Sequence, residues 1–255
     1  MKIRILGSGY GECKARKKIL RDFRRKGGVL IDERLLFDAP SDICLAIDDL
    51  GFSELYRSID SVIISHSDEG HFSPEAITKL SKRKRLKVYA SDNVLRLIPE
   101  EANVEKIPVY PFEPVDIDEE YRLVPLPSNH TAHDTSEECY NYVLMGEKNL
   151  FYALDGGFIN YNAFKFLVNI KLDAVIADAA FCGFEKISKS LEHNGIEFCR
   201  IIKETFMQSG IIEPSAKFIL SHIPSDKKIS IHEIFLPLAQ EYGMTLAYDG
   251  YFTSV

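Results

Sequence analysis

Short apolar segments that end in a histidine or an aspartate recur along this chain, and they constrain its fold more than any other feature. Runs of Val, Ile, Leu and aromatic residues that stop at polar residues are typical of buried β-strands. Open α/β sheets place their polar chemistry at strand ends, so we expect four of the side chains after these runs, His66, His130, Asp155 and His222, to converge on one site. The runs are residues 62–64, 123–127, 150–154, 172–177 and 218–220, and the residues that follow them are His66, His130, Asp155, Asp178 and His222.

The first of these runs leads into the densest group of candidate ligands. Residues 65–72 read Ser-His-Ser-Asp-Glu-Gly-His-Phe. Taken alone, this segment fits a solvated loop with incidental histidines. A core histidine is usually solitary, however, so the repeated placement of His and Asp at strand ends favours a metal site.

The rest of the pattern alternates strands with helices, which predicts two sheets with helices on their outer faces. The sequence contains no repeat, low-complexity tract or linker, so we expect a single domain over residues 1–255. The predicted helices are 43–50, 74–80 and 94–98, and the predicted strands include 3–6, 29–31, 35–37, 86–90 and 140–145.

Composition limits the class of protein. The hydrophobic content of 45% and the charged content of 27% are ordinary for a globular protein. No apolar segment approaches the roughly 20 residues of a membrane span, and the N-terminus lacks a signal-peptide pattern. The five cysteines are scattered without a Cys-x-x-Cys pair, which suggests reduced thiols. We therefore expect a cytoplasmic protein with no membrane partner.

Charge is distributed unevenly along the chain. The net charge of −7 disfavours nucleic acid as a partner, because such binding depends on phosphate neutralisation. Residues 14–26 are nonetheless strongly basic, and they follow a glycine-rich turn at residues 7–11. They are predicted to form an electropositive flap in which Arg24 and Arg25 bind an anionic substrate, because charges this dense are costly to bury. A solvated charged helix or loop is the alternative.

The order of these residues resembles the metallo-β-lactamase superfamily over the whole chain. Within it, the likeness is greatest to the phosphoribosyl 1,2-cyclic phosphate phosphodiesterases, with the protein B of pyrroloquinoline quinone biosynthesis as a related branch. The resemblance implies a four-layer αββα sandwich, an α/β fold of two mixed sheets with helices on the outer faces. The matching segments are Ile5 to Gly9, Arg24-Arg25, Asn129-His130, Tyr152 to Asp155, Glu192 to Asn194 and Ala247 to Gly250.

The resemblance also implies a set of metal ligands, with two departures. The family pattern is His-x-His-x-Asp-His, whereas here Asp68 replaces a histidine and Gly70 replaces the carboxylate. A carboxylate at position 68 favours iron or manganese over zinc. The resemblance implies one or two divalent ions, and zinc, manganese and iron all remain candidates. Carried over by position, the first metal would have His66, Asp68, His130 and Asp155, and the second would have His71, Asp155 and His222.

The implied activity is hydrolysis of a small anionic phosphodiester, cyclic phosphates included, by a hydroxide that the metal ions generate near neutral pH. Asp155 and His193 are the catalytic candidates, with His193 as a general acid or phosphate contact and a surface histidine as the alternative. Two other functions stay open. One is a catalytically weakened metal-binding accessory protein, and the other is an RNA-processing nuclease, which the acidic net charge disfavours. A homodimer is also left open.

Overall fold

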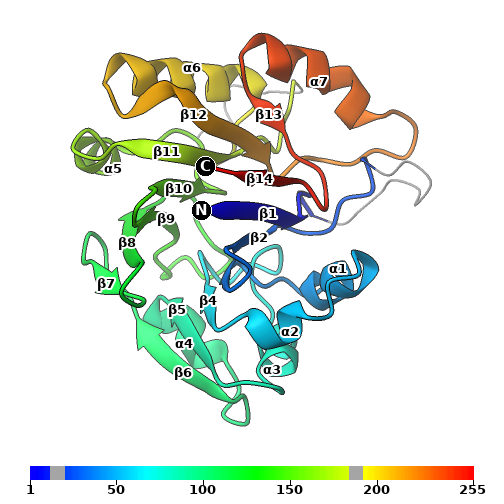
Figure 1. Cartoon of the computed structure of the whole chain (residues 1–255), viewed down its shortest axis with the longest axis vertical. Helices are drawn as coiled ribbons and strands as arrows, with labels where there is room; N and C mark the ends of the chain where they lie inside the picture. Colours follow the sequence, from blue (N-terminus) through cyan, green and yellow to red (C-terminus); the bar gives the residue numbers. More distant parts are fainter. Residues whose placement is uncertain (12–20, 184–191) are drawn as a thin grey trace.

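The computed structural model describes residues 1–11, 21–183 and 192–255. In these residues two seven-stranded sheets face each other, and helices lie on the outer face of each sheet (Figure 1). Both sheets contain parallel and antiparallel pairs. The predicted four-layer αββα sandwich is therefore confirmed.

The first sheet contains the N-terminal half of the chain and the last strand. Its order is β14-β1-β2-β3-β4-β5-β6. The pairs from β14 to β3 are antiparallel and those from β3 to β6 are parallel, and the predicted hairpin is the β2–β3 pair. The strands are β1 (Lys2–Gly7), β2 (Gly28–Ile31), β3 (Leu35–Phe37), β4 (Ser61–Ile63), β5 (Leu86–Ala90), β6 (Val104–Pro108) and β14 (Phe252–Ser254).

The second sheet has the order β13-β12-β11-β10-β9-β8-β7. Strands β10 to β13 are parallel, so the carboxyl ends of β10, β11 and β12 lie side by side at one edge. The strands are β7 (Val115–Asp116), β8 (Arg122–Pro127), β9 (Tyr140–Met145), β10 (Leu150–Ala153), β11 (Leu172–Asp178), β12 (Ile212–Ser221) and β13 (Thr245–Leu246).

Helices cover the outer faces, and side chains cap the N-termini of α3, α4, α5 and α7. The hydroxyl of Ser73, the residue before Pro74, accepts a hydrogen bond from the Ala76 N–H. Ser91 caps the next helix in the same way. The helices on the first sheet are α1 (Ile43–Asp49), α2 (Leu55–Ser58), α3 (Pro74–Leu80) and α4 (Asp92–Leu97), and those on the second are α5 (Tyr161–Leu167), α6 (Ile196–Gln208) and α7 (Ile231–Glu241). In the described ranges, no helix combines the length and apolarity that crossing a membrane requires.

The middle layer of the core joins the two sheets. Ile5 and Phe37 of the first sheet pack with Tyr142, Tyr152 and Ile176 of the second, and all five side chains are buried. Burial of each large side chain stabilises the fold by roughly 1.5–3 kcal/mol. Two further apolar clusters hold the helices against the outer faces. The strand ends that carry histidine and aspartate are thereby fixed relative to one another.

Candidate metal centre

Asp155 lies at the centre of a group of four histidines that come from loops after three different strands. Its Oδ2 atom is 3.0 Å from His71 Nε2, 3.5 Å from His66 Nε2 and 3.9 Å from His130 Nε2. Its Oδ1 atom is 2.8 Å from His222 Nε2. The convergence expected from the strand-end pattern is present, and every ligand predicted for the second metal lies in this group.

Three residues at these strand ends adopt the left-handed backbone conformation that non-glycine residues rarely use. The φ angles are +60° at Asp38, +50° at Asp155 and +61° at His222. Each such residue costs on the order of 1 kcal/mol, and such strain is concentrated at functional sites. The surrounding packing therefore holds these side chains in positions that the local chain alone would not favour.

Asp68 completes a second group with His66 and His130. Its Oδ2 atom lies 3.3 Å from His130 Nε2 and 3.7 Å from His66 Nε2, while Oδ1 accepts a hydrogen bond of 2.8 Å from the His133 N–H. Burial acts to raise the pKa of Asp68, but the His133 hydrogen bond and the neighbouring histidines outweigh it and lower the pKa. Asp68 is thus an ionised carboxylate in the position where the family pattern has histidine.

Buried nitrogen and oxygen atoms of this cluster lack hydrogen-bond partners among the described residues. They include Nε2 of His66, His71 and His222, and Oδ1 of Asp155. Buried polar atoms are nearly always satisfied by a partner, so this group of atoms is unusual. Imidazole nitrogens and carboxylate oxygens are the donor set that zinc, manganese and iron accept. The residues present therefore fit a divalent cation.

A carboxylate behind the cluster, Asp38, fixes one of the histidines. Asp38 is fully buried and accepts hydrogen bonds from Ser65 N–H (2.8 Å), Ser65 Oγ (3.0 Å) and Tyr152 OH (2.7 Å). Its Oδ2 atom is also 2.7 Å from His71 Nδ1, which directs His71 Nε2 toward Asp155. The sequence analysis missed Asp38, although it directly follows a strand as Asp155 does.

The charges in this cluster distribute its protons unequally. Burial acts to lower the pKa of His71, but Asp155 and Asp38 outweigh it and raise that pKa well above its usual value. Burial and the neighbouring His71 charge lower the pKa of His66 to about 3. Burial acts to raise the pKa of Asp155, but His222 and His71 hold it well below its usual range. Without a cation, His71 therefore holds its proton much more tightly than His66 does.

Metal binding should release that proton. Because the pKa of His71 is raised, the imidazole is protonated at pH 7 in the metal-free protein, and a cation must displace the proton. Affinity should therefore rise with pH until the pKa of His71 is passed. Calorimetric titration of metal into the protein in two buffers of different ionisation enthalpy measures the protons released. Binding without proton release and independent of pH would contradict this assignment.

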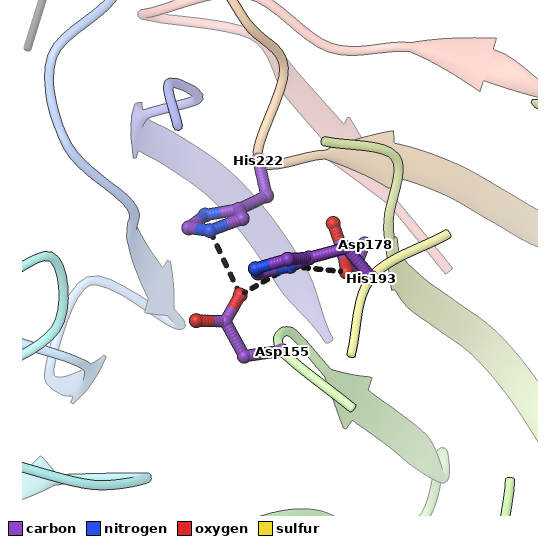
Figure 2. A group of neighbouring side chains, drawn as sticks. All are labelled: Asp155, Asp178, His193 and His222. Atoms are coloured by element: carbon purple, nitrogen blue, oxygen red, sulfur yellow. Dashed lines mark hydrogen bonds and ion pairs between the residues drawn. The ribbon is translucent and has the colours of Figure 1, made fainter. Parts of the chain in front are cut away.

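His193 lies between Asp155 and Asp178, and Asp178 orients it (Figure 2). His193 Nδ1 is 2.9 Å from Asp178 Oδ2 and 3.4 Å from Asp155 Oδ1. Asp178 also accepts from the Ala180 and Asn194 N–H groups, so both of its oxygens are engaged, and it serves to orient His193. Burial acts to lower the pKa of His193, but Asp178 and Asp155 raise it to about 9. The sequence analysis noted Asp178 at its strand end but gave it no role.

Comparison with solved structures decides the fold family. Zn²⁺-bound PqqB from Methylobacterium extorquens matches with a TM-score of 0.74 and 16% identity, covering 100% of each chain. The metallo-β-lactamase fold protein YhfI from Bacillus subtilis matches with a TM-score of 0.73 and 16% identity, covering 99% of this chain and 98% of that one. The protein has the metallo-β-lactamase fold. Human tRNase Z, short form, is also similar, with a TM-score of 0.71, 14% identity and coverage of 100% and 99%.

At these sequence identities the comparison shows the metallo-β-lactamase fold but does not show the activity. The activity has to be argued from the chemistry of the site. By sequence, no protein-family model and no curated protein matches the chain. The narrower likeness to cyclic phosphate phosphodiesterases, and the role of each site residue, stay predictions.

Gly70 stands where the metallo-β-lactamase pattern has a carboxylate, and the space beside it is open. A Cβ built at Gly70 would have no heavy atom within 4 Å. The change Gly70→Asp should therefore be accommodated and should tighten the weaker of two metal-binding phases by roughly tenfold or more, since even partners outside the ligand shell are worth that much. Chelator competition with elemental analysis measures both phases. Gly70→Ala is the matched control, and equal effects of the two changes would contradict the prediction.

The structure corrects the expectation that the whole basic segment avoids the core. Arg24 is 1% exposed, and its guanidinium donates to Ala247 O at 2.6 Å and to Ser8 Oγ at 2.8 Å, with His232 Nδ1 at 3.1 Å. Burial and the Arg24 charge lower the pKa of His232 to about 4, so its neutral ring can accept this hydrogen bond. Charge density misled the prediction because acceptors from distant segments satisfy the guanidinium.

Arg25 lines a cavity different from the one beside the candidate centre. Its guanidinium pairs with Asp49 and lies over the Phe23 ring, in a cavity of about 550 Å³. Asp68 instead lines a cavity of about 620 Å³ together with Arg96. Substrate binding by Arg25 stays a prediction, and residues 14–20 of the expected flap lie outside the described ranges.

Proposed function

We propose that the protein is a metal-dependent hydrolase that cleaves small phosphodiesters, cyclic phosphates included. The observation that carries the proposal is the buried Asp155, which four histidines approach within 3.9 Å through their Nε2 atoms. The bound zinc of PqqB supports metal occupancy of a site in this fold.

The proposed ligands divide between two positions. Asp155 contributes to both, because its Oδ2 atom faces His66 and His71 and its Oδ1 atom faces His222. Cations held there would supply activation of water and neutralisation of phosphoryl charge. The first position would be held by His66, Asp68, His130 and Asp155, and the second by His71, Asp155 and His222.

His193 is proposed as the proton donor for the leaving group. Asp178 binds its Nδ1 atom, so Nε2 carries the proton that can be transferred (Figure 2). The raised pKa of His193 keeps the imidazole protonated at neutral pH. A phosphodiester needs such a donor because its departing alkoxide must be protonated, and this requirement favours phosphodiesters over substrates with leaving groups that are stable as anions.

The test of the function uses metal-depleted protein supplied with zinc, manganese or iron(II). We expect hydrolysis of a dialkyl phosphodiester and of a nucleoside 2′,3′-cyclic phosphate, with slower turnover of a phosphomonoester. Failure to hydrolyse any phosphodiester at full metal occupancy would refute the activity. That outcome would favour the metal-binding accessory protein, for which the missing carboxylate at Gly70 is the supporting observation.

Replacing His193 with glutamine should lower kcat by about 10²–10⁴-fold for substrates with alkyl leaving groups, the range typical of a lost general acid. The loss should be much smaller for a 4-nitrophenyl leaving group, which departs without protonation. His133→Gln is the control, since His133 contacts Asp68 through its backbone N–H. Equal losses with both leaving groups would show that His193 acts in another way.

A further inference from the structure

We propose that Tyr10 and Phe181 form a subsite beside His193 that selects phosphodiesters whose leaving alcohol carries a planar aromatic group. This inference rests on the proposed function, since it assigns the leaving group of that reaction. Neither aromatic residue belongs to the ligand set or to the proton donor pair.

Backbone hydrogen bonds of Gly9 and Tyr10 fix the position of Tyr10 beside the site. Its N–H donates to Ile223 O at 2.9 Å, and the preceding Gly9 N–H donates to Arg25 O at 2.7 Å. A Cβ at Gly9 would lie 2.8 Å from Arg25 O, so this close approach requires glycine. The glycine-rich turn therefore places the Tyr10 ring next to His222.

The Tyr10 ring contacts the two histidines on one side of Asp155. Its centroid is 5.0 Å from that of His193 and 5.0 Å from that of His222, with interplanar angles of 69° and 68°. The side chain is nevertheless 42% exposed. An aromatic ring that served only to fill the core would be buried, whereas this ring combines site contact with an accessible surface.

Phe181 flanks the same histidine. Its ring centroid is 5.5 Å from that of His193, with an interplanar angle of 82°, and its side chain is only partly buried. Its N–H donates to Asn194 O at 3.1 Å, which ties Phe181 to the segment that carries His193. Two accessible aromatic rings therefore surround the proposed proton donor.

The position of His193 identifies the part of the substrate that meets these rings. A general acid must reach the oxygen of the leaving group, so the group attached to that oxygen lies next to His193. Aromatic side chains stack with aryl groups and nucleobases. Such stacking accepts any planar ring and favours it over a non-planar group. The chemistry therefore points to an aryl or nucleoside alcohol as the leaving group.

The experiment measures binding with two non-hydrolysable phosphinate probes of similar size, benzyl(methyl)phosphinate and (cyclohexylmethyl)(methyl)phosphinate, in which a methylene group replaces the oxygen of the leaving group. Dissociation constants are determined by calorimetry on the metal-loaded protein, with elemental analysis of every variant. We expect the full-length protein to prefer the planar phenyl probe by roughly tenfold, the scale of one stacking contact. Tyr10→Leu and Phe181→Leu should each reduce this preference, and Tyr10→Phe should retain it.

Tyr161→Leu is the matched control, because Tyr161 is 72% exposed on α5 and lines a separate apolar cavity. No preference in the unmodified protein, no binding of either probe, or a preference unchanged in both leucine variants would overturn the subsite. Turnover of phosphodiesters without any phenyl preference would overturn the subsite alone. A Tyr10-dependent preference in a protein that hydrolyses no phosphodiester would support the subsite and refute the proposed hydrolysis.

Discussion

Replacing Asp155 with asparagine should remove stoichiometric metal binding and lower hydrolysis by at least about a thousandfold, since Lewis-acid stabilisation is worth several kcal/mol. Asp155 is the one residue that both proposed metal positions share. The substitution keeps the shape of the side chain but removes the negative charge that faces His66, His71, His130 and His222. Elemental analysis after dialysis, together with initial rates, measures both effects.

Asp173→Asn is the control for Asp155. Asp173 pairs with Lys148 at 2.8 Å near the protein surface, and the pair lies outside the cluster. This variant should keep its metal and its activity. Full metal occupancy in the Asp155→Asn protein would show that the histidines alone bind the cation and that Asp155 is not the shared ligand.

Replacing Asp38 with asparagine should destabilise the metal-free protein by about 3 kcal/mol or more, the range for removing one partner from a buried ionic network. Asp38 is fully buried, and only donors approach its two oxygens. An amide would direct N–H groups at Tyr152 OH and His71 Nδ1 and leave them without an acceptor. Asparagine tolerates the φ of +60° at this position, so the backbone does not confound the result.

Urea unfolding of the metal-free protein measures the loss at Asp38, because metal would add its own binding free energy to the folded state. Asp48→Asn is the control, since the Asp48 carboxylate is partly exposed and its nearest cation, Lys79, is 3.8 Å away. An unchanged urea midpoint in Asp38→Asn would show that the network is not required for stability.

Periodicity and strand-end residues predicted two sheets with helices on their outer faces and the group around Asp155, while the resemblance to the metallo-β-lactamase superfamily implied the four-layer sandwich. The sheets and the group depend on local sequence, because a strand must end where its apolar run ends. Asp38 shares that signal, because it directly follows the apolar run at residues 35–37. Its role depends on Tyr152, which is 114 residues away in the chain. No local pattern reports such a partner.

The basic segment shows the opposite error. The density of charge around Arg24 correctly signals a high cost of burial, but hydrogen-bond acceptors reduce that cost. The acceptor at Ala247 is 223 residues away, so only the fold reveals it. The glycines at residues 7–11 permit a close backbone approach, but only the three-dimensional structure reveals the partner of that approach and the contacts of Tyr10.

The hydrogen bonds between the two sheets have a consequence for how the centre can vary. Tyr142 OH of the second sheet donates to Ile64 O beside the first, and the Tyr140 N–H donates to Ser65 O in the loop that carries His66. His66 and Asp155 are thus supplied by opposite halves of the molecule, and the interlayer packing sets the separation between them. Substitutions in the core between the two sheets can therefore change metal affinity without altering a ligand. A cation bound between the two halves would also stabilise their association.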